Sequence, residues 1–335
     1  KDVPGYATLV QKNTLESLDD YIADAGINLA DFNGITDQVT VDGSLYELPF
    51  RSDYWLIYYN KDVFDAAGIA YPSNDMTIED YDALARQLTD TTYGSQVYGC
   101  HYHTWRSAVE LFGILDGKHS ILDGNYDWMI PYYDMILSEE DDGVCQTYTD
   151  LSTEGLHYSA AFSNGNVAMM NMGSWFISTL ISNLDSGEYD SSLCGNWGIA
   201  SYPHPDGAEA GSTIATITGL AVTSASANKD AAFDFVNWVS GTEGAKVMAS
   251  TGNFPAIMTD DVINTIAGMA GFPTDESSKE ALNITNAYLE VPYAENVSEI
   301  NRILDTYHTS IMNREVTVEE GVASMNEQVG KILNQ

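Results

Sequence analysis

Basic residues are scarce in this sequence: 13 Lys and Arg stand against 49 Asp and Glu, a formal net charge of −36. Nucleic acid and anionic lipid headgroups need Lys or Arg to neutralise phosphate, so we expect neither as a partner. The cations form no cluster that would attract an anion, and the predicted ligand is therefore neutral or cationic. The bland explanation stays open, namely that acidity only keeps a secreted protein soluble.

Cysteine is equally rare. Cys100, Cys145 and Cys194 lie far apart and form no CxxC pair. This excludes a disulfide scaffold and a structural zinc site of the usual spacing. One disulfide bridge remains an alternative, but we expect buried free thiols.

Long apolar runs are missing as well. No stretch approaches the ~20 apolar residues of a membrane helix, since the longest are short segments such as residues 55–59. The start of the chain lacks the charged and apolar regions of a signal peptide, so we expect any targeting segment to have been removed. No Pro- or Ser-rich linker divides the 335 residues. Two lobes without a linker imply that the chain crosses between them as ordered strands.

Strand and helix signals alternate, which predicts an α/β fold. Residues 45–48, 55–59 and 167–172 are predicted strands, and residues 55–59 are apolar on both faces, which favours a buried parallel sheet. Helix starts are predicted from capping signals and turns, at Thr77 (a capping box with Asp80), Trp175, Asn228, Thr242 and Thr317 (a capping box with Glu320).

Catalytic and cofactor motifs are absent: there is no G-x-S-x-G, P-loop, G-x-G-x-x-G or H-E-x-x-H. We therefore predict no enzyme, no cofactor and no metal. His101 and His103 would share one face of a strand, but a lone H-x-H is more often structural than metal-binding.

Aromatic residues are abundant, with 21 Tyr and 6 Trp. Three clusters join them to polar residues near predicted strand ends: RSDYW (51–55), HYHTW (101–105) and GSW (173–175). A pyranose presents C–H patches to aromatic faces and hydroxyls to Asp, Asn, Arg and His. Ligands of α/β proteins bind at the carboxyl ends of strands, so the clusters favour sugar binding over core packing.

Six segments, in order along the chain, resemble the extracellular solute-binding proteins of sugar ABC importers, the family that includes maltose-binding protein. They are LESLDDYI (15–22), DGSLYELP (42–49), YYNKDVF (58–64), FSNGNVAM (162–169), GSW (173–175) and NKDAAFDF (228–235). Each match is weak alone, but the ordered set covers most of the chain and is specific.

The resemblance implies an α/β fold of two lobes, a periplasmic-binding-protein-like clamp (type II) that closes by hinge motion on a sugar in the cleft between them. Residues 1–52 and 218–265 are expected to form lobe 1, and residues 53–217 and 266–335 lobe 2. The hinge crossings are expected near residues 51–54 and 213–218. Family members open with a strand–helix–strand unit that precedes the segment starting here at Lys1, so lobe 1 is expected to be incomplete.

The resemblance also assigns the ligand contacts. Trp175 matches the tryptophan that stacks on a sugar ring, and Asp53 the carboxylate at a crossing that bonds the sugar. The second cluster matches a contact loop, which supplies His101, Tyr102, His103 and Trp105. Weaker transfers or simple adjacency add Arg51, Tyr54, Thr216, Thr218, Glu295 and Asn296.

The function implied is a non-catalytic receptor that delivers a carbohydrate to the membrane permease subunits of an ABC importer. It is expected to be a monomer outside the cytoplasm, either a cell-surface lipoprotein or periplasmic. Two alternatives stay open: a secreted glycan-cleaving enzyme, which reads sugars with the same side chains, and a binding protein for a peptide, polyamine or metal cation.

Overall fold

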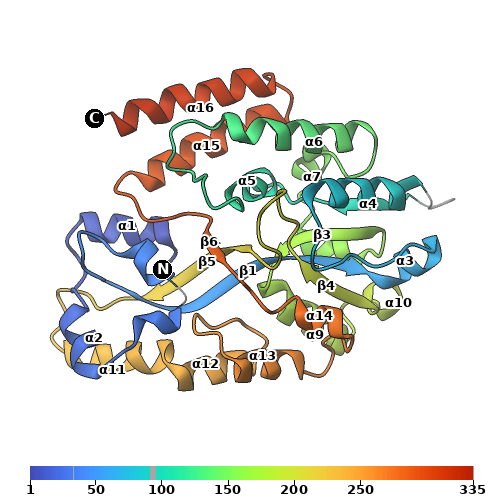
Figure 1. The fold of residues 1–335 in the computed structure, drawn as a ribbon. Coiled ribbons are helices and arrows are strands. Elements are labelled where there is room, and N and C mark those ends of the chain that lie inside the picture. The colour runs from blue at the N-terminus through green and yellow to red at the C-terminus, as the bar shows by residue number, and fades with distance from the viewer. Residues whose placement is uncertain (33, 91–95, 335) are drawn as a thin grey trace.

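The computed structural model describes residues 1–32, 34–90 and 96–334 of the chain. It is built around one long strand, β1 (Leu48–Asn60), which runs through the middle of the molecule (Figure 1). Every residue of β1 from Ser52 to Asn60 is buried. The strand ends where the Asn60 side chain accepts a hydrogen bond from the backbone N–H of Asp62 and so caps the next helix.

Two groups of strands pair with β1 along different parts of its length. Its first part, as far as Tyr54, pairs with β5 (Thr213–Leu220), which in turn pairs with β6 (Ala287–Leu289). From Trp55 onward β1 pairs with β3 (Val167–Gly173), and from Leu56 onward also with β4 (Trp197–Ser201). The strand β2 (Tyr98–His101) adds to β3.

The predicted parallel environment of residues 55–59 is wrong, because β1 runs antiparallel to β3, β4 and β5. Parallel pairs do exist, between β2 and β3 and between β5 and β6. A strand that is apolar on both faces is covered by other elements on both faces, but this pattern does not determine whether its neighbours run parallel or antiparallel. The predicted strand at residues 45–48 is also displaced, since the strand begins only at Leu48.

Helices surround this sheet (Figure 1). Near the start of β1 lie α1 (Val3–Gln11), α2 (Asp19–Ala25), α11 (Lys229–Ser240) and α12 (Thr242–Ala249). Two long helices, α15 (Val297–Met312) and α16 (Val318–Leu333), pack on each other and extend over α6 (Ile130–Asp141). The other helices are α3 (Lys61–Ala67), α4 (Ile78–Asp90), α5 (Ser107–Ile114), α7 (Tyr148–Glu154), α8 (Tyr158–Ser163), α9 (Trp175–Ser186), α10 (Ser191–Cys194), α13 (Asp260–Ala267) and α14 (Glu276–Glu280).

Of the five predicted helix starts, three agree with the structure and two differ in detail. Both capping boxes are confirmed, since Thr77 and Asp80 exchange hydrogen bonds at the start of α4, as do Thr317 and Glu320 at α16. The predicted start at Trp175 is also confirmed. Asn228 precedes α11 but makes no side-chain capping bond, and Gly241 rather than Thr242 occupies the cap of α12.

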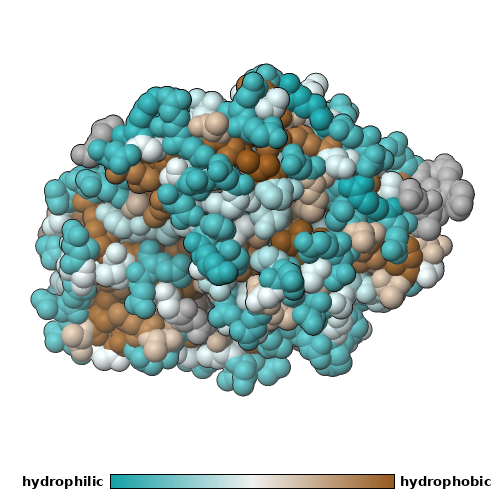
Figure 2. Space-filling view, turned by 45° about the horizontal axis from the view of Figure 1, so that its top comes forward, coloured by the Kyte–Doolittle hydropathy of each residue, from teal (hydrophilic) through white to brown (hydrophobic). Residues whose placement is uncertain are grey.

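The three cysteines are free and buried, as expected. In the part of the chain that is described, no helix has both the length and the apolar character to cross a membrane. The face shown in Figure 2 is mostly hydrophilic with scattered apolar patches. Three exposed apolar side chains come from α11 and α12: Phe235, Trp238 and Val247.

Candidate functional site

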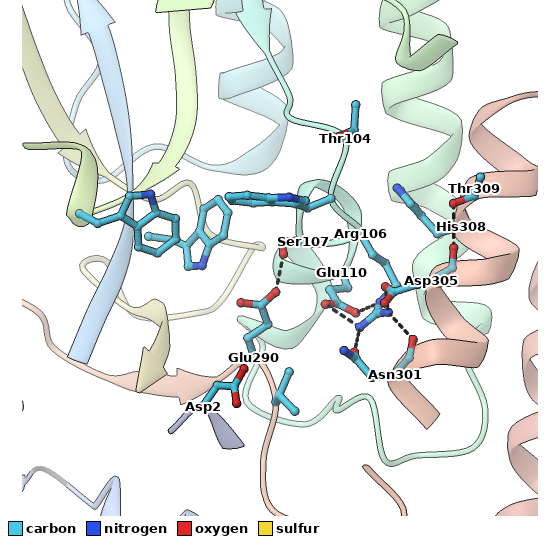
Figure 3. Close-up of a pocket in the computed structure, with 14 residues that line it drawn as sticks. Asp2, Thr104, Arg106, Ser107, Glu110, Glu290, Asn301, Asp305, His308 and Thr309 are labelled. Carbon is cyan, nitrogen blue, oxygen red and sulfur yellow. Dashed lines mark hydrogen bonds and ion pairs between the residues drawn. The ribbon is translucent and has the colours of Figure 1, made fainter. Parts of the chain in front are cut away.

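A cavity of about 560 Å³ opens beside β1 where six segments meet (Figure 3). They are the residues before α1, strand β1, the loop leading into α5, the start of α9, the segment after β6, and α15. The lining residues are Asp2, Trp55, Thr104, Trp105, Arg106, Ser107, Glu110, Trp175, Glu290, Val291, Asn301, Asp305, His308 and Thr309.

Three tryptophans form one wall of this cavity. The ring centroids of Trp55 and Trp175 are 5.5 Å apart at an angle of 82°, and those of Trp55 and Trp105 are 6.4 Å apart at 89°. Trp55 is buried, whereas Trp105 is 40% exposed. Edge-to-face packing of this kind holds the rings rigidly and leaves an indole surface open to a ligand.

The turn at Gly173 explains how Trp175 reaches this position. A Cβ atom at Gly173 would lie 2.1 Å from the Trp175 ring, so only glycine allows the indole to fold back over the strand end. This is the physical content of the G-x-W pattern found in the sequence. The indole nitrogen then donates a hydrogen bond of 3.1 Å to the hydroxyl of Tyr158, on α8.

His103 stands behind this wall. Its ring lies 4.6 Å from that of Trp105 and 5.4 Å from that of Tyr158, both edge to face. Burial lowers the pKa of His103 to about 4 and that of His101 to about 3. Both rings are therefore neutral at pH 7 and add no positive charge to the cavity.

Opposite the tryptophans, the polar floor is centred on the buried guanidinium of Arg106. It pairs with Glu110 one turn further along α5 and donates a hydrogen bond of 3.1 Å to the backbone carbonyl of Asn301. It also bonds the Asn301 side chain and the carboxylate of Asp305. This network fastens α5 to α15. Among the described residues that line the cavity, Arg106 is the only Lys or Arg.

Glu290, in the segment after β6, is a second acid of the cavity and is partly buried. Its carboxylate accepts a hydrogen bond from the hydroxyl of Ser107 (Figure 3). Burial raises the pKa of Glu290 to about 7, and the negative charge of Glu110 pushes it in the same direction. The carboxyl group thus changes charge near neutral pH.

Asp53 lies two residues before Trp55, on the same face of β1. Its carboxylate is 2.6 Å from the Arg51 guanidinium and accepts a hydrogen bond of 3.0 Å from Ser174. Burial raises the pKa of Asp53, while Arg51 and Ser174 oppose that rise. Asp53 is not itself among the residues that line the cavity.

The structure thus brings Trp105 and Trp175 together in one cavity, with His103 packed behind them. Thr216 lies opposite Asp53 across the β1–β5 pair. His101, Tyr54 and Tyr102 are buried residues of the core. Four predicted residues line other hollows: Arg51 and Thr218 one of about 360 Å³, Tyr54 one of about 420 Å³, and Glu295 one of about 500 Å³. Asn296 is the exposed residue before α15.

Sequence reasoning missed several lining residues, above all Trp55, Arg106, Glu290 and Asn301. Trp55 could have been predicted from the sequence, because it lies two residues after Asp53 in the first aromatic cluster and therefore on the same face of the strand. The other three carried no signal, since they meet only after the chain returns through β6 and α15.

Comparisons with known proteins agree with this picture. The model of the family described as bacterial extracellular solute-binding protein matches residues 2–246. A sugar transporter from Rhizobium etli, solved in an open conformation, is 47% identical and superimposes with a TM-score of 0.91. That match covers 98% of this chain and 83% of the other.

Two further relatives are more distant. A substrate-binding protein from Listeria monocytogenes in complex with cycloalternan is 21% identical with a TM-score of 0.80, over 100% of this chain and 84% of the other. The mannitol-binding protein of Pseudomonas aeruginosa is 23% identical over 315 residues, 90% of this chain. This chain spans 66% of the length of that relative. The structural matches over nearly the whole chain confirm the predicted two-lobed α/β fold.

Proposed function

Because this chain belongs to the bacterial extracellular solute-binding proteins, we propose that it binds a sugar or oligosaccharide in the cavity beside β1 and delivers it to an ABC importer. The observation that carries this proposal is the wall formed by Trp55, Trp105 and Trp175. Indole faces fixed at large mutual angles suit the C–H faces of adjacent sugar rings.

The charges of the cavity favour a neutral ligand over an anionic one. Arg106 is neutralised by Glu110 and Asp305, and Asp2 and Glu290 add further acidic groups. A sugar meets these groups through its hydroxyls, which donate to carboxylates and accept from the side-chain amide of Asn301. An anionic substrate would meet repulsion with no free cation to offset it.

Among the residues predicted from sequence, we propose Trp105 and Trp175 as stacking surfaces and His103 as the group that positions them. Asp53 and Thr216, facing each other across β1 and β5, are proposed to bond sugar hydroxyls when the lobes close. We also propose the two lobes predicted from the sequence. Lobe 1 comprises residues 1–52 and 218–265, and lobe 2 comprises residues 53–217 and 266–335. The change of partner along β1 near residue 54 supports a hinge crossing there.

We propose that the protein acts outside the cytoplasm, together with membrane permease subunits. The relatives support this setting, since one is a sugar transporter and another an ABC substrate-binding protein. The protein is proposed to be a receptor rather than an enzyme and to act as a monomer.

Differential scanning fluorimetry against a panel of mono- and oligosaccharides tests the proposal, because a ligand of the native state raises the melting temperature by mass action. Hits are then measured by calorimetry, where a dissociation constant near ~1 μM corresponds to about −8 kcal/mol. A panel of neutral sugars, sugar alcohols and oligosaccharides that leaves the melting temperature unchanged would count against sugar binding.

The same hits separate a receptor from a glycan-cleaving enzyme. The protein is incubated with the bound oligosaccharide, and the mixture is analysed by mass spectrometry. A receptor returns the sugar intact, whereas shortened products would identify an enzyme.

A further inference from the structure

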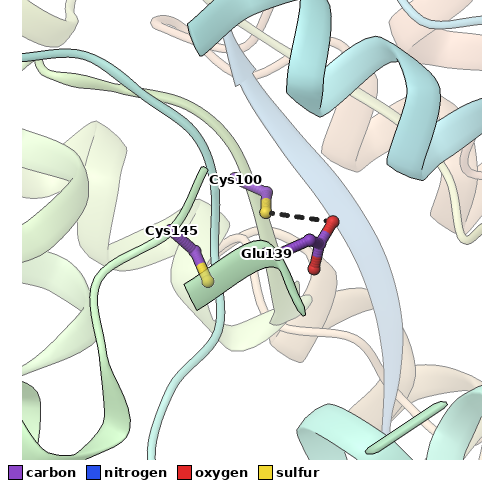
Figure 4. Close-up of side chains that lie close together, drawn as sticks. All are labelled: Cys100, Glu139 and Cys145. Atoms are coloured by element: carbon purple, nitrogen blue, oxygen red, sulfur yellow. Dashed lines mark hydrogen bonds between the residues drawn. The ribbon is translucent and has the colours of Figure 1, made fainter. Parts of the chain in front are cut away.

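We propose that Cys100, Cys145 and Glu139 form a binding site for a thiophilic divalent cation of the zinc type, separate from the sugar cavity (Figure 4). Their ligand atoms, two Sγ and one carboxylate oxygen, all lie within 4.8 Å of one another. Cys100 belongs to β2, Glu139 to the last turn of α6, and Cys145 to the loop that follows α6. Sequence spacing predicted no metal here, because the three residues form no local motif.

The spacing of these atoms fits a tetrahedral metal site. With metal–sulfur bonds of about 2.3 Å and metal–oxygen bonds of about 2.0 Å, the sulfur–oxygen edge of the tetrahedron measures about 3.5 Å. The Sγ of Cys100 lies 3.7 Å from Oε1 of Glu139. Only small side-chain movements would therefore bring three ligands to bonding distance of one cation.

Burial gives the site its second, independent argument. All three residues are buried, and Glu139 has no exposed surface. In the described part of the chain, Oε2 of Glu139 lacks a well-aligned hydrogen bond, and the nearby Tyr102 hydroxyl only partly offsets the burial of this carboxylate. A buried carboxylate with so few donors is costly, and a metal bond would stabilise it.

The ligand types select the cation. Thiolates favour zinc and other soft metals over magnesium or calcium, which prefer oxygen ligands alone. The cation binds cysteine as thiolate, so binding would release the thiol protons.

A disulfide between Cys100 and Cys145 is the competing use of the two thiols. It would remove the S–H group that Cys100 offers to Glu139, leaving that buried carboxylate with less hydrogen bonding than before. A cation satisfies all three groups at once, and the geometry therefore favours it. The bound cation would join the end of α6 to β2, the strand that leads into the loop carrying His103 and Trp105.

The test uses the full chain, purified without chelator. The protein is incubated with excess Zn²⁺, freed of unbound metal by gel filtration, and analysed for metal content by mass spectrometry. We expect one Zn²⁺ per chain and a higher melting temperature than for chelator-treated protein. Co²⁺ in place of Zn²⁺ should give the charge-transfer absorption of thiolate ligands.

Cys100→Ser and Cys145→Ser should abolish binding, and Glu139→Gln should weaken it at least about tenfold, because it removes the charged ligand. The matched control is Cys194→Ser, which removes a buried thiol outside the cluster and should leave binding unchanged. Glu139→Gln and the cobalt spectrum of the unmodified chain keep the test valid if the cysteine variants fail to fold.

Three results would overturn the proposal: a Cys100–Cys145 disulfide in the protein as purified, reduced thiols with no Zn²⁺ bound, or equal Zn²⁺ binding in all variants. None of them bears on sugar binding, which the glycan panel measures separately.

Discussion

The indole nitrogen of Trp175 donates a hydrogen bond to the phenolic oxygen of Tyr158 at 3.1 Å. This bond connects the start of α9 with the start of α8 and fixes the orientation of the indole beside the cavity. Tyr158 is itself held edge to face against Trp105 and Phe176. The stacking surface is therefore oriented before any ligand arrives, which reduces the ordering cost of binding.

Trp175→Ala should weaken sugar binding about 100-fold or more, equivalent to about 3 kcal/mol, because it removes the central indole of the wall. The melting temperature should fall little, since Trp175 is only partly buried. Calorimetry with the sugar found in the panel measures the first effect. Trp238→Ala, which removes an exposed tryptophan of α11, is the control and should bind normally. Native affinity in Trp175→Ala would contradict the stacking role.

Tyr158→Phe keeps the ring contacts but removes the acceptor for Trp175. A hydrogen bond of this kind contributes about 1 kcal/mol, so affinity should fall about fivefold while the fold stays intact. Tyr71→Phe deletes the hydroxyl of an exposed tyrosine that bonds Asp65, and it should leave affinity unchanged. If both variants bind equally well, the hydrogen bond does not position the indole.

Local sequence signals predicted several helix starts and the turn that brings Trp175 to the cavity. The capping boxes at Thr77 and Thr317 depend on residues three apart, and the turn at Gly173 depends on its neighbour Trp175. Such short-range chemistry is visible in a sequence. It also led from the aromatic clusters to Trp105, which lines the cavity, while its contact with a ligand stays a prediction.

Long-range relations were not visible in the same way. The antiparallel direction of β1 depends on strands that follow more than a hundred residues later, and its apolar pattern is equal for both directions. The contact of Arg106 with Asn301 joins residues 195 apart. Burial raises the pKa of Glu290 and the charge of Glu110 adds to the rise, while Ser107 opposes it. These groups are distant in sequence, so the sequence neighbours of Glu290 do not indicate the perturbed pKa.

Asp53→Asn tests the proposed sugar contact at the crossing. The substitution keeps the shape of the side chain but removes the charge that accepts hydrogen bonds, so affinity should fall about tenfold or more. Stability should change little, because burial already disfavours the charged form and Arg51 keeps access to water. The affinity is measured by calorimetry, with the exposed Asp65→Asn as control. A large drop in melting temperature with unchanged affinity would assign Asp53 a purely structural role.

Arg106→Met should destabilise the protein by about 3–5 kcal/mol, since it leaves the buried carboxylate of Glu110 without its partner. Arg106→Met combined with Glu110→Gln should recover part of that loss, because no buried charge remains. Arg86→Met is the matched control: its ion pairs are partly exposed, and its loss should cost less than about 1 kcal/mol. Urea unfolding measures all three. Equal losses for Arg106 and Arg86 would show that the cavity floor is not held by a buried ion pair.

Glu290→Gln should change how stability depends on pH. The folded protein raises the pKa of Glu290 from 4.5 to about 7, so the folded state holds its proton more tightly than the unfolded state. The resulting contribution to stability is fully present below pH 4.5 and is lost as the pH rises through 7, up to about 3 kcal/mol in total. The Glu290→Gln variant does not lose this stability as the pH rises, because Gln does not ionise.

The variant should therefore gain in melting temperature relative to the unmodified protein between pH 5 and pH 8, with the change centred below pH 7. Melting curves of both proteins across that interval measure the difference. The groups that face Glu290 are Ser107, Glu110, Arg106 and Trp55, and all are retained in the variant. A difference in melting temperature that stays constant with pH would mean that Glu290 is already ionised at pH 5, and that the cavity is wetter than its burial indicates.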